Sequence, residues 1–377
     1  MRPIISVCIP SYNRPEELRE LLSSIARQPQ GRWEIVISED CAPRKAEVGI
    51  VFEQFCRTHP NTPVTFHSND SNLGFDGNLR VLLERASGTY CLFMGDDDLL
   101  CDGALSKVEA AVANPNVGVV LRAWQSIEKS SGKVIEYHRY YPRDLLFGPG
   151  STTVVSFLRK SVFLSGLAVH RESALKYATT RFDGTLLYQV WLTGRILATM
   201  NGYYMSDIVS VRRVGGEHFF GSSEVERGRF EPKKTTPAHS ITFISGLLEI
   251  ANTLGDEVRS DIPAGVRRDL AAYSFPMLSM HAKHLSRQEF RRYAAALARL
   301  GLSDHWLFWA YCWLLSTVGA RASERMVRLV KRAIGHTPVL VRNRTKATMG
   351  ALLRGDGITC PNSPGGDTDR DFRTPAR

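Results

Sequence analysis

The chain has 377 residues, of which 43% are hydrophobic and 23% charged, a composition ordinary for a globular protein with a sizeable core. Its net charge of +10 suits anionic partners such as nucleic acid, anionic lipid or phosphorylated substrates. The sequence contains no helix-turn-helix, zinc-finger or RNA-recognition signature, so we do not expect nucleic acid binding. The apolar stretch 4–9 is too short for the core of a signal peptide, which predicts a cytoplasmic protein.

Strand-like and helix-like segments alternate in the first third of the chain. Continuous apolar runs predict five strands, and residues with helical spacing predict four helices between them. The strands are expected at 4–9, 33–38, 64–67, 90–94 and 117–121, and the helices at 15–25, 48–56, 79–86 and 104–113. This alternation is typical of an α/β protein with a mostly parallel sheet covered on both faces.

Polar residues follow three of the predicted strands. They are the turn Ser11–Arg14, the pair Glu39-Asp40 and the run Asp96-Asp97-Asp98. In parallel sheets, ligands bind outside the carboxyl ends of the strands. Three such ends therefore favour one shared ligand site over three unrelated turns.

The run Asp96 to Asp98 directly follows an apolar strand and Gly95. Adjacent carboxylates repel one another, and near a buried strand they need a cation or hydrogen-bond donors. A divalent ion such as Mg²⁺ or Mn²⁺ meets this need and commonly binds substrate phosphates as well. The alternative is a solvated acidic turn that caps the next helix.

The second half of the chain is mixed and then helical. A strand is expected at 162–170, a helix at 186–198, a strand at 203–211 and a polar loop or lid at 212–234. Helices are expected at 241–254, 266–281, 288–300 and 305–318, and residues 354–377 have the composition of a disordered tail.

An aromatic-rich segment begins the C-terminal part of the helical region. Residues 306–320 carry no charge, are too few to span a bilayer, and include three tryptophans that suit a water–lipid interface. Residues 321–334 then form a basic amphipathic pattern typical of a helix on an anionic membrane surface. The alternative is a buried core helix followed by a helix with a solvated basic face.

Four motifs occur in order: Ser-Val-Cys-Ile-Pro-Ser-Tyr-Asn-Arg at 6–14, Glu-Ile-Val-Ile-Ser-Glu-Asp at 34–40, Asn72-Leu73-Gly74 with Asn78, and Gly-Thr-Tyr-Cys-Leu-Phe-Met-Gly-Asp-Asp-Asp at 88–98. Together they resemble family 2 glycosyltransferases of the GT-A fold, and most closely the abequosyltransferase-like branch, whose members build bacterial surface polysaccharides. The resemblance covers about residues 4–215. It implies a GT-A (Rossmann-like) mixed, mostly parallel sheet in residues 1–235. A helical region over 236–353, which we expect to associate with membrane, and the tail 354–377 would follow.

The resemblance also implies roles for individual residues. The base-and-ribose pocket falls on Pro10, Ser11, Tyr12 and Arg14, and Asp40 is the acid that contacts the nucleobase. Glu39 matches the first acid of the family's acidic pair, and Asn72, Gly74 and Asn78 match its Asn-x-Gly segment. The metal-binding Asp-x-Asp falls on Asp96–Asp98 and implies Mn²⁺ or Mg²⁺. The family's usual first aspartate aligns with Gly95, so we favour Asp96 and Asp98 as ligands, with a site that uses Asp97 as the alternative.

The general base is the point at which the chain departs from the family. Many inverting members carry a Glu-Asp pair where this chain has Tyr188-Gln189. Asp183 is the nearest carboxylate, so Asp183 and Gln189 are the candidate catalytic residues at this position. Either Asp183 is the base or the mechanism differs, and a helix-capping role for Asp183 is the alternative. Arg212, Arg213 and His218 of the polar loop are candidates to reach a diphosphate when the loop closes.

These patterns predict a metal-dependent glycosyltransferase. It would move a sugar from a nucleoside-diphosphate-sugar donor to a saccharide acceptor, lipid-linked by family resemblance, at the inner face of the plasma membrane. A nucleotidyltransferase is disfavoured because no Gly-rich phosphate loop follows the first strand. A catalytically inactive nucleotide-sugar-binding or scaffold protein of a polysaccharide assembly complex is the alternative, because the Glu-Asp pair is missing.

Overall fold

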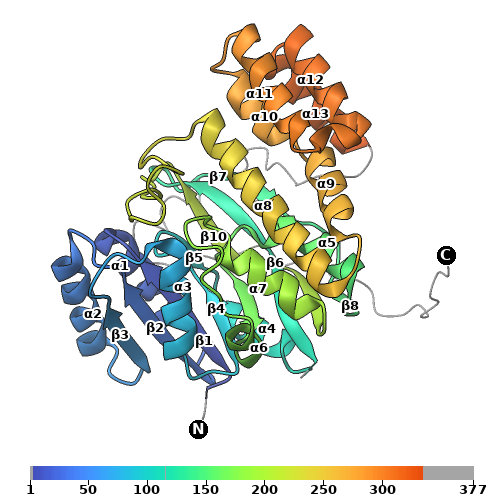
Figure 1. Cartoon of the computed structure of the whole chain (residues 1–377). Helices are drawn as coiled ribbons and strands as arrows, with labels where there is room; N and C mark the ends of the chain where they lie inside the picture. Colours follow the sequence, from blue (N-terminus) through green and yellow to red (C-terminus); the bar gives the residue numbers. More distant parts are fainter. Residues whose placement is uncertain (1–2, 115, 334–377) are drawn as a thin grey trace.

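The computed structural model describes residues 3–114 and 116–333 (Figure 1). Within these residues the strands form a ten-stranded mixed sheet in the order β3-β2-β1-β4-β9-β6-β10-β5, with β7 paired to β6 and β8 paired to β10. The strands are β1 Ile5–Ser11, β2 Trp33–Glu39, β3 Val64–Ser68, β4 Tyr90–Phe93, β5 Leu99–Leu100, β6 Val117–Glu128, β7 Val134–His138, β8 Leu145–Phe147, β9 Leu167–His170 and β10 Asn201–Val214. The predicted α/β fold is confirmed.

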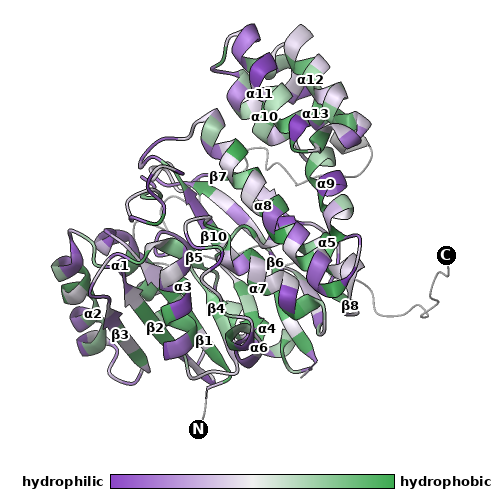
Figure 2. Ribbon diagram, in the orientation of Figure 1, coloured by the Kyte–Doolittle hydropathy of each residue, from purple (hydrophilic) through white to green (hydrophobic). Residues whose placement is uncertain are grey.

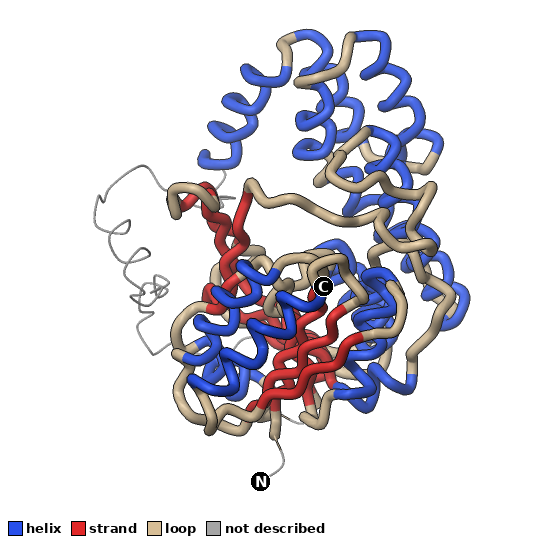
Figure 3. Tube along the Cα trace, turned by 90° about the vertical axis from the view of Figure 1, so that its left-hand side faces the viewer, coloured by secondary structure: helices blue, strands red, loops and turns tan. Residues whose placement is uncertain are grey.

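The helices of the described residues cover both faces of the sheet and then extend beyond it. They are α1 Pro15–Ala26, α2 Lys45–Thr58, α3 Gly74–Arg85, α4 Ala104–Ala111, α5 Ser151–Leu158, α6 Arg171–Lys176, α7 Tyr188–Leu197, α8 Pro237–Val258, α9 Ile262–Ala272, α10 Phe275–Ala282, α11 Arg287–Arg299, α12 Trp306–Thr317 and α13 Ala320–Ala333. In two views, α10 to α13 gather beyond the ends of α8 and α9, set apart from the sheet (Figures 1 and 3). Every described helix is too short or too polar to cross a bilayer.

The sheet is buried from both sides because its strands are apolar throughout. In β1, Ile5, Val7 and Ile9 pack in one cluster with α1, α2 and α4, whereas Cys8 joins the cluster on the other side with α3, α5, α7 and α8. Successive side chains of a strand point to opposite faces, which explains this division. The central strands are mostly hydrophobic, whereas each helix carries both hydrophobic and hydrophilic residues (Figure 2).

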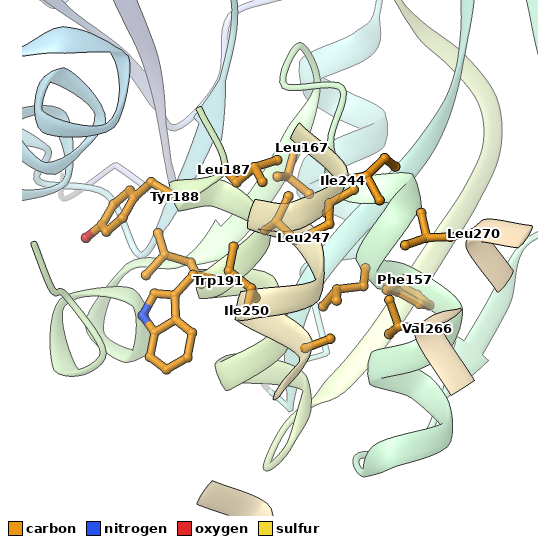
Figure 4. Packing of buried hydrophobic residues seen from close by; sticks show 14 of the residues in the cluster. Phe157, Leu167, Leu187, Tyr188, Trp191, Ile244, Leu247, Ile250, Val266 and Leu270 are labelled. Atoms are coloured by element: carbon orange, nitrogen blue, oxygen red, sulfur yellow. The ribbon is translucent and has the colours of Figure 1, made fainter. Parts of the chain in front are cut away.

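The second cluster joins the sheet to the C-terminal helices. Leu187, Tyr188 and Trp191 of the α7 region pack beside Ile244, Leu247 and Ile250 of α8, with Val266 and Leu270 of α9 nearby (Figure 4). The same cluster includes Phe308, Cys312 and Leu315 of α12. One apolar core therefore runs from β4 to the C-terminal helices.

Most predicted elements differ from the structure by a few residues at their ends, and two differ more substantially. The strand expected at 162–170 begins only at Leu167, because Gly166 has a φ of +90° that extended backbone does not adopt. The helix expected at 266–281 is two helices, α9 and α10, because Pro276 lacks the N–H that a continuous helix would need. The predicted tail 354–377 and residues 334–353 of the predicted helical region lie outside the described residues.

Asp76 of α3 joins the two halves of the sheet domain. Its carboxylate accepts hydrogen bonds from the backbone N–H groups of Leu186 and Tyr188, both at 2.9 Å, at the start of α7. Leu186 has a φ of +64°, which a leucine rarely adopts, so this turn depends on its hydrogen bonds. Burial raises the pKa of Asp76 to about 7, although the two N–H donors lower it.

We expect Asp76→Ala to lower the free energy of unfolding by about 3 kcal/mol, because it leaves two buried N–H donors unpaired. Urea denaturation followed by circular dichroism measures this loss. Asp70→Ala, which removes an exposed carboxylate, is the matched control and is expected to change stability by less than about 0.5 kcal/mol. A loss for Asp76→Ala no larger than that of the control would contradict the role given to Asp76.

Candidate active site

The carboxyl ends of β2, β1 and β4 meet at one edge of the sheet because these strands are parallel neighbours. A cavity of about 870 Å³ lies at this edge. Most of the predicted site residues line it, namely Pro10, Ser11, Tyr12, Arg14, Asp40, Asn72, Gly74, Asn78, Asp96, Asp97, Asp98 and Gln189. Glu39 and Asp183 are the two predicted residues outside its wall.

Asp96 is tied to the turn after β1. Its two carboxylate oxygens accept hydrogen bonds from the backbone N–H of Tyr12 at 3.0 Å and from Arg14 Nη1 at 2.8 Å. Arg14 Nη2 also lies 3.3 Å from Asp97 Oδ2. Burial raises the pKa of Asp96 to about 6 even though Arg14 lowers it. Arg14 is therefore the cation that partly compensates the first two acids.

Asp98 is held from the other side of the cavity. Its Oδ2 accepts a hydrogen bond from Ser165 Oγ at 2.5 Å, and its Oδ1 accepts one from the backbone N–H of Arg213 at 3.3 Å. Burial and the neighbouring charge of Asp97 raise the pKa of Asp98 to about 8. A carboxyl group with this pKa is mostly protonated at neutral pH, and an approaching positive charge favours its ionised form.

The chemistry of these acids fits a hard divalent cation, which prefers oxygen ligands. In the described residues, however, no group of three or more His, Cys, Asp or Glu side chains is arranged to hold a metal. Both oxygens of Asp96 already have partners. An ion bound here would thus need oxygens from a substrate as well, as Mg²⁺ commonly takes from phosphates.

Asp40 lies at the opposite end of the strand edge. Its Oδ1 accepts hydrogen bonds from Asn69 Nδ2 at 2.8 Å and from the backbone N–H of Leu73 at 2.9 Å. Asn78 Nδ2 donates to the carbonyl of Ser38 at 3.0 Å and so braces the same loop. Burial raises the pKa of Asp40 to about 6. Its carboxylate is thus held in place with acceptor capacity left for a ligand.

Glu39 stabilises the loop after β2 instead of facing the cavity. It accepts hydrogen bonds from the backbone N–H groups of Cys41 and Ala42, at 3.1 and 2.7 Å, and from Ser68 Oγ at 3.0 Å. Its side chain is completely buried. The capacity of Glu39 to accept hydrogen bonds is thus used within the protein, and its place in the nucleotide site stays a prediction.

Asn72 and Gly74 form the turn that opens α3. Asn72 Oδ1 accepts a hydrogen bond from the backbone N–H of Gly74 at 3.0 Å. Gly74 has a φ of +75°, and a Cβ there would lie 2.7 Å from Ser223 Oγ. Only glycine therefore fits this position without strain.

The two candidate catalytic residues have different surroundings. Asp183 forms a two-point ion pair with Arg80, at 2.5 and 2.8 Å, away from the cavity. Gln189 is buried, and its Nε2 donates to the carbonyl of Val162 at 3.0 Å. Its buried Oε1 has no partner within the described residues, and the residue lines the cavity. Gln189 is thus the member of the pair that lies at the cavity.

The loop after β10 covers the cavity. Arg14 Nη2 donates to the carbonyl of Glu217 at 2.5 Å, and Phe219 packs edge-on against Tyr12. Glu226 accepts hydrogen bonds from the backbone N–H groups of Phe75 and Gly221, at 2.8 and 2.7 Å. Glu226 was not predicted, because its partner Phe75 is 151 residues away in sequence and no motif surrounds it.

Arg212, Arg213 and His218 all line the cavity. The sequence predicts all three in one loop, but β10 extends to Val214. Arg213 Nε donates to the carbonyl of Asp97 at 2.5 Å, and its guanidinium also pairs with Glu20 of α1. It therefore supports the acidic turn from outside.

The cavity continues from the acids to a largely apolar end, which the sequence does not predict. Trp124 of β6 and residues of the segment 162–165 form one side of it. Residues of α8 and of the α9–α10 region form the other side, namely Phe243, Ile244, Leu247, Leu270, Tyr273 and Met277. In sequence these residues have the pattern of ordinary core positions, which is why they carry no signal for a site.

Residues 6–179 match the model of glycosyl transferase family 2. An abequosyltransferase from Salmonella typhimurium is 38% identical over 108 residues, which are 28% of this chain and 32% of that protein. A GalNAc(5)-diNAcBac-PP-undecaprenol beta-1,3-glucosyltransferase from Campylobacter jejuni is 31% identical over 106 residues, which are 28% and 33% of the two chains. These alignments span about a third of the length of each relative.

The crystal structure of S. aureus TarS 1–349 in complex with UDP-GlcNAc is similar in fold, with a TM-score of 0.51 at 16% identity. The similarity covers 88% of this chain and 92% of that chain. It supports the GT-A architecture predicted from the motifs, in which the acids after β4 lie beside the turn after β1. Residues 6–179, a little under half of the chain, are thus similar to glycosyl transferase family 2.

Proposed function

We propose that this protein transfers a sugar from a nucleoside-diphosphate-sugar donor to a saccharide acceptor in bacterial surface polysaccharide biosynthesis. The observation that carries the proposal is the meeting of Asp40, Arg14 and the acids Asp96 to Asp98 in one cavity at the strand ends. A site for a nucleotide sugar needs a hydrogen-bond acceptor for the base, a positive charge for the diphosphate and space for the sugar. The names of the relatives, which include an abequosyltransferase and an undecaprenol-linked glucosyltransferase, support the pathway and a lipid-linked acceptor.

The residues would divide the donor between them. Pro10, Ser11 and Tyr12 would contact the base and ribose, with Asp40 accepting a hydrogen bond from the base. Asp96 and Asp98, with Asp97 beside them, would hold Mn²⁺ or Mg²⁺, which supplies positive charge to the departing diphosphate. Arg14 would orient the same phosphates by hydrogen bonds. The acceptor hydroxyl must lose a proton, and the neutral Gln189 can orient this hydroxyl but cannot take the proton.

We expect hydrolysis of the preferred nucleotide sugar to require Mn²⁺ or Mg²⁺ and to stop with EDTA. Asp98→Ala should lower the rate at least about 100-fold, because the developing charge on the leaving group loses its ion. Asp256→Ala, which removes an exposed carboxylate on α8, is the control and should keep the wild-type rate. A panel of nucleotide sugars in a thermal-shift assay selects the donor.

Full activity of Asp96→Ala/Asp98→Ala in EDTA would contradict the metal model. Donor binding by the wild type without any turnover would favour the rival role of an inactive nucleotide-sugar-binding or scaffold protein.

The role of Asp40 gives a pH dependence. Burial raises the pKa of Asp40 to about 6, so below this pH the carboxyl group is protonated and loses acceptor capacity. We expect the affinity for a nucleotide sugar to fall about tenfold from pH 7 to pH 5, measured by calorimetry. Asp40→Asn should weaken binding at pH 7 and flatten the profile. The pKa of Asp96 is also about 6, so the comparison of the wild type with Asp40→Asn shows which carboxyl group causes the pH dependence. Identical pH profiles of these two proteins would refute the role given to Asp40.

The proposed place of action is the inner face of the plasma membrane, with α12 and α13 in contact with anionic lipid. Trp306, Trp309 and Trp313 share one face of α12 and are 71%, 53% and 67% exposed. Their neighbours Phe308 and Cys312 point into the core instead. Exposed tryptophans on one helix face suit the membrane interface.

The next helix supplies the matching charge. In α13, Arg321, Arg325 and Arg328 are exposed together with the apolar Leu329 and Val330. Basic and apolar side chains on one exposed helix are complementary to an anionic bilayer. The exposed side chains of α12 and α13 therefore support the proposed contact with a lipid surface.

We expect the triple variant Trp306→Ala/Trp309→Ala/Trp313→Ala to bind anionic phosphatidylglycerol liposomes about tenfold more weakly than the wild type. A flotation assay measures the bound fraction. The control is Ile50→Ala/Ile135→Ala/Leu146→Ala, which removes three exposed apolar side chains elsewhere. Equal flotation of the wild type and the tryptophan variant would reject the membrane surface.

A further inference from the structure

Five residues of the cavity wall have a buried polar atom without a partner in the described part of the chain, namely Ser11, Trp124, Gln189, His218 and Ser223. Two of these atoms, the indole N–H of Trp124 and Oε1 of Gln189, belong to side chains that contact the segment 162–165. Trp124 is 6% exposed and Gln189 is 1% exposed, and both line the cavity. Buried polar groups are almost always hydrogen-bonded, since an unpaired group loses its hydration without compensation. One donor and one acceptor therefore await a ligand.

Both side chains are fixed in place by their other contacts. Gln189 Nε2 donates to the carbonyl of Val162, and this bond leaves the amide oxygen as the free end. The Trp124 ring lies between His138, with ring centroids 3.5 Å apart, and Phe163, with centroids 4.1 Å apart. Because neither side chain can turn without losing these contacts, the two groups are preorganised.

The segment 162–165 links this pair to the acids. Val162 contacts Gln189, Phe163 contacts Trp124, and Ser165 donates its hydroxyl to Asp98. One short segment thus contacts the side chains of Trp124 and Gln189 as well as Asp98.

A wholly buried arginine holds the segment rigid. Arg122 donates from Nε to the carbonyl of Ser165 at 2.8 Å and from Nη2 to the carbonyl of Phe163 at 2.9 Å. Gly166 follows with a φ of +90°, and a Cβ there would lie 2.9 Å from Arg122 Nε. The segment is therefore held in a defined conformation. Burying the charge of an arginine costs free energy, and here its guanidinium is hydrogen-bonded to two backbone carbonyls.

We infer that Trp124 and Gln189 bind the acceptor saccharide, with the indole N–H donating to one hydroxyl and the amide oxygen accepting from another. The hydroxyl groups of a sugar can donate and accept hydrogen bonds, and its ring also has apolar C–H faces. The apolar end of the cavity, with Phe243, Leu247 and Tyr273, suits those faces. Asp40 and the acids already account for the nucleotide and its diphosphate, so this end is left for the second substrate. The inference rests on the proposed function.

The test compares two tryptophans. Trp124→Phe removes an unpaired N–H, so it should leave the melting temperature unchanged or raised while it weakens saccharide binding. Trp191→Phe removes an N–H that donates to the carbonyl of Tyr177 at 2.9 Å, outside the cavity, so it should lower the melting temperature and leave saccharide binding unchanged. A merely structural role of Trp124 would not produce this opposite pattern.

The probes are p-nitrophenyl glycosides of glucose, galactose, mannose, rhamnose and N-acetylglucosamine, titrated by saturation-transfer NMR in the presence of the bound nucleotide. We expect Trp124→Phe and Gln189→Leu each to weaken the bound glycoside about five- to tenfold, the effect of one lost hydrogen bond. Affinity for the nucleotide sugar should change less than about twofold in both variants. Gln189→Glu, which keeps an acceptor oxygen, should retain more glycoside affinity than Gln189→Leu and serves if the leucine variant does not fold.

Several outcomes overturn the inference: no glycoside binds the wild type, both variants bind like the wild type, or Trp191→Phe weakens binding as much as Trp124→Phe. Loss of nucleotide-sugar affinity in both variants would also overturn it, because the pair would then belong to the donor site. Failure of the wild type to bind any nucleotide sugar would instead refute the proposed function, so the two failures are distinguishable.

Discussion

The burial of acidic side chains at the end of β4 is the constraint on which the rest of the site depends. Asp96 and Asp98 are almost completely buried, and carboxyl groups in that position need partners. Those partners come from separate parts of the chain: the turn after β1, the segment 162–165 and the end of β10. The hydrogen bonds that Asp96 and Asp98 need thus bring three segments, distant in sequence, together around one cavity.

The same principle joins the halves of the sheet domain. Asp76 of α3 holds the turn before α7, and Glu226 of the covering loop holds the start of α3. In each case a buried carboxylate accepts hydrogen bonds from backbone N–H groups that no helix or strand satisfies. Charged groups here act mainly as internal scaffolding, and several of them, among them Arg14, Asp40 and Asp96, combine such contacts with a place in the cavity wall.

The sequence predicts those parts of the fold that depend on local patterns. The runs that form β1, β2 and β4 are apolar and short, and their polar ends converge because parallel neighbours share an edge. Contacts between remote residues leave no such trace. Asp183 resembles a catalytic acid in sequence, but its partner Arg80 lies on α3, about 100 residues earlier. Trp124 resembles a core residue, and only its unpaired N–H in the fold distinguishes it.

The segment 162–165 couples two parts of the cavity wall. Val162 contacts Gln189, Phe163 contacts Trp124 and Ser165 contacts Asp98, while Arg122 holds the backbone carbonyls of Phe163 and Ser165. A substitution there that reshapes the apolar end would therefore also shift the support of Asp98. Side chains of α8, α9 and α10 line the same cavity, whereas the carboxylate of Asp98 accepts its hydrogen bonds from Ser165 and Arg213. Substitutions on these helices can therefore change the shape of the apolar end while the hydrogen bonds of Asp98 stay in place.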